Sequence, residues 1–140
     1  MDVRLTELDA AARDIIARFP AQRGERAYVL GFSGELGAGK TTLIQHIARA
    51  LGVTDAVTSP TYVLAERYPL AGQPFTSLIH IDAYRITADE AHTIGWDAYT
   101  SDPSNLILVE WPERLGPHTA GIPMVTLAVV DAETRSITYA

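Results

Sequence analysis

The chain has 140 residues, a formal net charge of −6 and no cysteine. This length predicts one domain, residues 1–140, with a substantial hydrophobic core, and the lack of cysteine excludes disulfides, thiolate zinc sites and cysteine nucleophiles. The acidic balance and the absence of any basic run argue against autonomous nucleic-acid binding. No apolar run approaches membrane-spanning length, and the N-terminus is neither basic nor continuously apolar. We therefore expect a cytoplasmic protein with no membrane anchor.

The first two predicted elements are a helix and a strand. Residues 5–19 carry an apolar stripe at helical spacing, with Thr6 as a candidate cap and Pro20 as the stop. Residues 27–32 form an apolar run of strand length that ends at Ser33.

A phosphate-binding motif follows this strand. Residues 34–41 read Gly-Glu-Leu-Gly-Ala-Gly-Lys-Thr, and Thr42 comes next. Its glycines let backbone N–H groups surround phosphate oxygens without a Cβ in the way. In such a loop Lys40 reaches the β- and γ-phosphates, and the Thr41 hydroxyl completes the Mg²⁺ shell. A helix is predicted directly downstream, from an apolar stripe of Leu43, Ile44, Ile47, Ala48 and Leu51 that stops at Gly52. Its N-terminus would point at the phosphates.

The connection after this helix exposes a cluster of hydroxyls ahead of a predicted strand at residues 62–68. Pro60 holds the preceding residue extended. Thr61 is a candidate sensor of the γ-phosphate, because P-loop proteins often order a threonine on this connection. A turn whose hydroxyls bond local backbone groups explains the same residues equally well.

Two apolar strands, residues 77–82 and 106–110, each end in a carboxylate, Asp82 and Glu110. Such positions beside a phosphate loop usually hold magnesium, and spacing alone does not choose between them. Alternation places His80 on the same face as Asp82, where it is either a packed side chain or part of the site. The second strand is continuously apolar, as expected for a central parallel strand.

The remaining elements complete an α/β pattern. The strand at 62–68 and the strand at 77–82 flank a surface loop and are expected to pair as a hairpin, so the sheet is mixed. Residues 87–90 form a capping box that opens a short helix ended by Gly95. A C-terminal hairpin is predicted from residues 123–130 and 135–139. The expected fold is a P-loop NTPase domain, a three-layer sandwich with a mixed central sheet.

Two absences bear on the nucleotide and on the reaction. No aspartate has glycine three places on, and the only lysine, Lys40, lies in the phosphate loop. A GTPase switch and a guanine-reading Asn-Lys motif are therefore missing, and ATP is the expected nucleotide. A small-molecule kinase needs an arginine-bearing lid and an acceptor pocket. After Glu110 only Arg114 and Arg135 remain, which disfavours that alternative.

Four motifs in order resemble the TsaE family, the small bacterial ATPase of tRNA threonylcarbamoyladenosine synthesis. They are residues 34–42, Ser-Pro-Thr-Tyr at 59–62, Asp-Ala-Tyr-Arg at 82–85 and Glu-Trp-Pro-Glu at 110–113. The likeness runs from about residue 28 to residue 115. Ala83 departs from it, since leucine is commoner between that aspartate and tyrosine, and this affects packing rather than chemistry.

The resemblance implies an ATPase that works with two partner proteins, TsaD and TsaB, and that meets tRNA only through their complex. Carried over by position, the phosphates would be bound by Gly37, Ala38, Gly39, Lys40, Thr41 and Thr42. Thr41 and Glu110 would hold Mg²⁺, Asp82 would assist the metal or orient the attacking water, and Thr61 would be the switch threonine. Trp111, Tyr84 and Arg85 would line the rim where a partner docks.

Three further expectations concern the base, the rate of hydrolysis and the competing class of protein. Glu113 and Arg135 are candidate contacts to the base. Hydrolysis by the isolated protein is expected to be weak, because an arginine supplied by a partner is worth about 10³ to 10⁵ in rate. A nucleotide-sensing module that does not hydrolyse ATP is the competing class, although it could dispense with Asp82 and Glu110, and both are present.

Overall fold

A central sheet of seven strands organises the part of the chain that the structure describes, residues 1–54, 65–72 and 74–140 of a computed structural model. The strands lie in the order β1-β7-β6-β2-β5-β4-β3. Their bounds are Asp2–Arg4 (β1), Tyr28–Ser33 (β2), Ala65–Pro69 (β3), Ser77–Asp82 (β4), Asn105–Glu110 (β5), Met124–Asp131 (β6) and Thr134–Tyr139 (β7). The helical elements are η1 (Leu5–Glu7), α1 (Leu8–Ile16), α2 (Lys40–Ala50), η2 (Ala88–Ile94), α3 (Trp96–Ser101) and η3 (Pro112–Thr119).

The four central strands, β6, β2, β5 and β4, are parallel to one another. Strands β3 and β7 pair antiparallel with β4 and β6, and β1 pairs antiparallel with β7. This confirms the mixed sheet and the C-terminal β6–β7 hairpin. It also confirms the β3–β4 hairpin over residues 65–69, while residues 62–64 of the predicted strand lie outside the described residues. Every residue of β5 is buried, which confirms its place as a central strand. Because parallel strands have their carboxyl ends at the same edge of a sheet, β2, β4 and β5 all end beside the loop that leads into α2.

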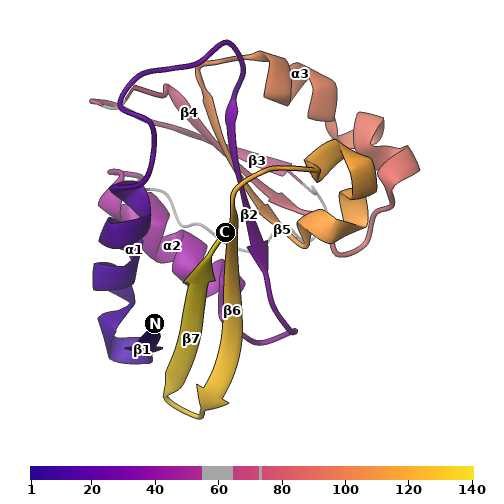
Figure 1. Cartoon of the computed structure of the whole chain (residues 1–140). Coiled ribbons are helices and arrows are strands. Elements are labelled where there is room, and N and C mark those ends of the chain that lie inside the picture. The colour runs from indigo at the N-terminus through magenta and orange to yellow at the C-terminus, as the bar shows by residue number, and fades with distance from the viewer. Residues whose placement is uncertain (55–64, 73) are drawn as a thin grey trace.

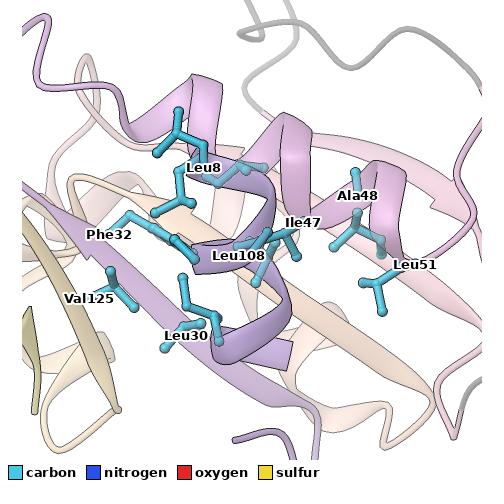
Figure 2. Close-up of a cluster of buried hydrophobic side chains, with 14 of the residues drawn as sticks. Leu8, Leu30, Phe32, Ile47, Ala48, Leu51, Leu108 and Val125 are labelled. Carbon is cyan, nitrogen blue, oxygen red and sulfur yellow. The ribbon is translucent and has the colours of Figure 1, made fainter. Parts of the chain in front are cut away.

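Helical layers cover both faces of the sheet (Figure 1). Helices α1 and α2 cover one face, where Leu8, Ile47 and Ala48 pack on Leu30, Phe32 and Leu108 of the strands (Figure 2). On the other face η2, α3 and η3 cover Ile79, Ile81 and Ile107. The three-layer sandwich is therefore confirmed, and burial of these apolar faces stabilises it at roughly 25 cal/mol per Å². Within the described ranges no helix has the length and apolarity needed to span a membrane.

Three elements differ from the sequence-based expectation. The first helix is shorter than residues 5–19: it opens with the turn η1, where the Arg4 backbone N–H donates to Glu7 Oε1, rather than at a Thr6 cap, and its α-helical part ends at Ile16. Strand β1 was not predicted, because three residues are too few to show alternation. Trp96–Ser101 forms α3, a helix too short for its periodicity to stand out.

Candidate nucleotide-binding site

The phosphate loop joins the end of β2 at Ser33 to the first residue of α2 at Lys40. Three of its residues have backbone angles that favour glycine, with φ of 148° at Gly34, 80° at Gly37 and 103° at Gly39. The predicted strand, glycine loop and helix are thus confirmed. The N-terminus of α2 faces the loop, and free N–H groups at a helix start attract phosphate.

Gly34 also lies against the C-terminal hairpin. A Cβ added there would be 2.5 Å from the Leu127 carbonyl oxygen of β6, whereas one added at Gly37 would meet nothing within 4 Å. The loop therefore packs against β6 at Gly34. Its glycines are required for different reasons. At Gly34 both conformation and space require glycine, and at Gly37 only conformation does.

Gly34→Ala is expected to lower the free energy of unfolding by about 2 to 3 kcal/mol, the upper part of the range for a strained backbone residue. Gly37→Ala is the matched control and should lose only about 1 kcal/mol, from the left-handed backbone alone. Urea unfolding of both variants measures the difference. Equal losses would show that β6 does not constrain the loop.

Lys40 is buried and holds its own loop closed. Its Nζ donates to the carbonyl oxygens of Gly34 at 2.6 Å and Glu35 at 2.9 Å, and it lies 4.2 Å from the centre of the Trp111 ring. Burial lowers the pKa of Lys40, and the charges of Glu110, Glu113 and Asp82 oppose that shift. Phosphate oxygens that entered the loop would replace these two carbonyl oxygens as acceptors of hydrogen bonds from the Lys40 ammonium.

Glu110 is the carboxylate that contacts the phosphate-loop helix. Thr41 Oγ1 lies 2.8 Å from its Oε1 and 2.9 Å from its Oε2, and His80 Nε2 lies 2.7 Å from Oε2. Asp82 pairs in register with Glu110 at the adjacent strand end, and its Oδ1 accepts the Tyr84 backbone N–H at 3.0 Å. Both predicted carboxylates therefore reach the same edge of the sheet, with Glu110 directly against Thr41.

These oxygen donors suit magnesium. Mg²⁺ is usually held by one or two carboxylates together with phosphates and water, and Thr41 and Glu110 supply a hydroxyl and a carboxylate already in contact. Among residues 1–54, 65–72 and 74–140 no group of three or more acidic or histidine side chains forms a metal cluster. A site that relies on the nucleotide for its remaining ligands needs none.

An aromatic cluster forms the rim of the site. Trp111, directly after β5, has a φ of 58°, in the left-handed region that bulky residues rarely adopt. Its ring lies 4.9 Å from that of Tyr84, and the Arg114 guanidinium lies 5.1 Å from the Tyr84 ring centre. The turn at Trp111 thus places an indole over Lys40. Sequence reasoning identified Trp111 and Tyr84, but not Arg114.

The other predicted residues are placed as follows. Thr42 is exposed in the first turn of α2, and Glu113 lies in the first turn of η3. Arg135, on β7, donates from Nε to the Ala38 carbonyl at 3.0 Å, so it contacts the loop. Thr61 lies outside the described residues. The His80–Glu110 contact was missed, although alternation had placed His80 on the correct face.

Comparison with known proteins finds one family along most of the chain. The family model described as Threonylcarbamoyl adenosine biosynthesis protein TsaE matches residues 5–137. The chain is 48% identical over 83 residues to the tRNA threonylcarbamoyladenosine biosynthesis protein TsaE of Streptomyces coelicolor, an alignment that covers 58% of this chain and 54% of that protein. It is 34% identical over 110 residues to the protein of that name from Synechocystis, covering 76% and 68%. The alignment to the Streptomyces coelicolor protein thus spans little more than half of the length of that protein.

A solved structure shows the same fold. The crystal structure of Bacillus subtilis YdiB superimposes with a TM-score of 0.71 at 25% identity and covers 99% of this chain and 83% of that one. The family match extends over almost every residue, and it includes the phosphate loop, Asp82 and Glu110. This chain therefore belongs to the TsaE family of threonylcarbamoyl adenosine biosynthesis proteins, and its fold is that of a P-loop NTPase.

Proposed function

We propose that this protein is the Mg²⁺-dependent ATPase of the assembly that forms threonylcarbamoyladenosine next to the anticodon of tRNA. The observation that carries the proposal is the convergence of Lys40, Thr41 and Glu110 at the N-terminus of α2. A phosphate loop alone binds nucleotide, but a carboxylate bonded to the motif threonine is what a hydrolysing site needs in addition. Residues 1–140 would form one ATPase domain. A role in tRNA modification would place the protein in the cytoplasm.

The residues that the sequence predicted for the site each have a task in this proposal. Residues 37–42 would bind the phosphates of ATP or ADP, and Thr41 with Glu110 would hold Mg²⁺, which neutralises phosphate charge when bound. Asp82, in register with Glu110, would assist the metal or orient the attacking water. Thr61 would sense the γ-phosphate. Hydrolysis by water needs only positioning and charge stabilisation, so no further nucleophile is required.

The state of Lys40 supports slow turnover by the isolated protein. Its ammonium is shared between two carbonyls of its own loop and lies against Trp111. A partner that contacts the rim of Trp111, Tyr84 and Arg85 could change this arrangement directly. We therefore propose that TsaD- and TsaB-like proteins stimulate hydrolysis, and that tRNA meets this subunit only through them.

The test is a pull-down with the full chain as bait, run with ATP, with ADP and without nucleotide. We expect capture of the two partner proteins, with a yield that depends on which nucleotide is present. Lys40→Ala should remove that nucleotide dependence. Capture of an unrelated complex would overturn the pathway and leave the ATPase intact.

Arg135 and Glu113 are proposed contacts to the nucleotide beyond the phosphates. Arg135→Met is expected to raise KM for ATP about tenfold, since a hydrogen bond from a charged group contributes about 1.5 to 3 kcal/mol. It would remove the donor to the Ala38 carbonyl and shift the loop. Steady-state hydrolysis of ATP and GTP measures the effect. Arg49→Met, at the exposed end of α2, is the matched control, and an unchanged KM in Arg135→Met would refute the assignment.

A further inference from the structure

His80 is a fully buried polar side chain in the site to which the proposed function assigns no task. It lies on β4, where its relative exposure is 0%. Its register partner on β5 is Leu108, two residues before Glu110, and its Nε2 reaches Glu110 Oε2 at 2.7 Å. The imidazole therefore extends along the sheet face from its own position toward the end of the neighbouring strand.

The direction of this hydrogen bond follows from its acceptor. Carboxylate oxygens only accept, so Nε2 of His80 carries the hydrogen. Thr41 Oγ1 lies within 2.9 Å of both Glu110 oxygens, but its single hydrogen serves one of them at a time. Glu110 is thus held by donors from two separate elements, β4 and α2. Two donors from different directions fix the plane of a carboxylate better than one.

Packing alone does not account for a histidine at this position. Its neighbours on the same face, Leu78 and Leu108, are fully buried aliphatic residues. Its Nδ1 has no hydrogen-bond partner among the described residues. A buried nitrogen without a partner destabilises the fold, and an apolar side chain in its place would avoid that cost. What the imidazole adds is the N–H that it donates to Glu110.

We propose that His80 is a positioning residue for the metal site: through Nε2 it holds the Glu110 carboxylate in the orientation that meets Thr41 and a nucleotide-bound magnesium. The inference rests on the proposed function and adds a residue to it. Partners that orient a ligating side chain typically change metal affinity 10- to 100-fold when removed. His80 should therefore govern how strongly magnesium tightens nucleotide binding, and should have little influence on nucleotide binding without metal.

The test uses the full-length protein and a fluorescent non-hydrolysable ATP analogue, titrated in EDTA and at increasing MgCl₂. Three variants separate the N–H from the side-chain volume. His80→Gln keeps an amide N–H near the place of Nε2, His80→Asn carries the same group one bond too short, and His80→Leu has no donor. His92→Gln, on the exposed surface of η2, is the matched control. Thermal unfolding shows which variants fold.

We expect the Leu and Asn variants to need about tenfold or more MgCl₂ for half-maximal tightening of binding, with affinity in EDTA unchanged. His80→Gln and His92→Gln should resemble the wild type. If His80→Leu does not fold, the comparison of Gln with Asn decides the question. A wild-type magnesium midpoint in the Asn variant, or a Gln variant no better than Asn, would overturn the role of His80. Wild-type protein that binds no nucleotide under any condition would overturn the proposed function as well.

Discussion

Replacing Lys40 with alanine is expected to lower ATP hydrolysis at least about 100-fold, comparable to the loss of a charge-stabilising donor in other active sites. Lys40 is the only lysine in the chain, and it is buried at the start of α2, where its Nζ is bonded to two loop carbonyls. No other side chain on the loop can supply an ammonium in its place. The measurement is phosphate release at saturating ATP and Mg²⁺, together with nucleotide affinity.

Arg49→Ala provides the control for this substitution. It removes one positive charge from the same helix, but at the exposed C-terminal turn, so its rate should equal that of the wild type. Stability must be measured alongside, because Lys40 also holds the loop closed. A Lys40→Ala protein that is folded and hydrolyses ATP at the wild-type rate would show that the loop is not the catalytic phosphate site.

Glu110→Gln is expected to have the largest effect of all, a loss of about 10³ in the Mg²⁺-dependent rate. The carboxylate is 3% exposed and bonded to Thr41. Glutamine keeps its shape but not its charge, and charge stabilisation through a metal is worth several kcal/mol, at tenfold in rate for each 1.36 kcal/mol. Phosphate release across a range of Mg²⁺ concentrations measures the change. Nucleotide binding in EDTA should be retained.

Glu25→Gln, on the exposed segment before β2, is the matched control for the lost charge. Glu110→Ala should lose as much activity as Glu110→Gln, because both lack the carboxylate. If phosphate release from Glu110→Ala equals that of the wild type, the enzymatic interpretation fails. The protein would then be a nucleotide-sensing module, the competing class that keeps the loop without a metal-holding acid.

Much of this site could be predicted because its parts are local in sequence. The phosphate loop is contiguous, and its flanking strand and helix show clear apolar patterns, so Gly34 to Thr42 were identified with their context. The ends of β4 and β5 could be predicted to meet, because parallel strands share an edge. Contact between Thr41 and Glu110 depends on how α2 docks on the sheet, and spacing carries no signal of that.

What the sequence did not predict depends on register and backbone geometry. The His80–Glu110 bond follows from the in-register pairing of β4 with β5, which no alternation pattern specifies. Trp111 reaches Lys40 because its backbone adopts a positive φ at the end of β5, which is unusual for a bulky residue. Strand β1 is three residues long and was invisible for that reason.

The most direct test of the central claim is phosphate release by the wild-type protein in ATP and Mg²⁺, alone and with the two partner proteins. The proposed function predicts slow release by the isolated chain, faster release with the partner pair, and none in EDTA. Arg85→Ala, tested in parallel, would show a lower isolated rate if that arginine acts within the chain. Fast release that is indifferent to the partners, or no release under any condition, would contradict the claim that this protein is a partner-dependent ATPase.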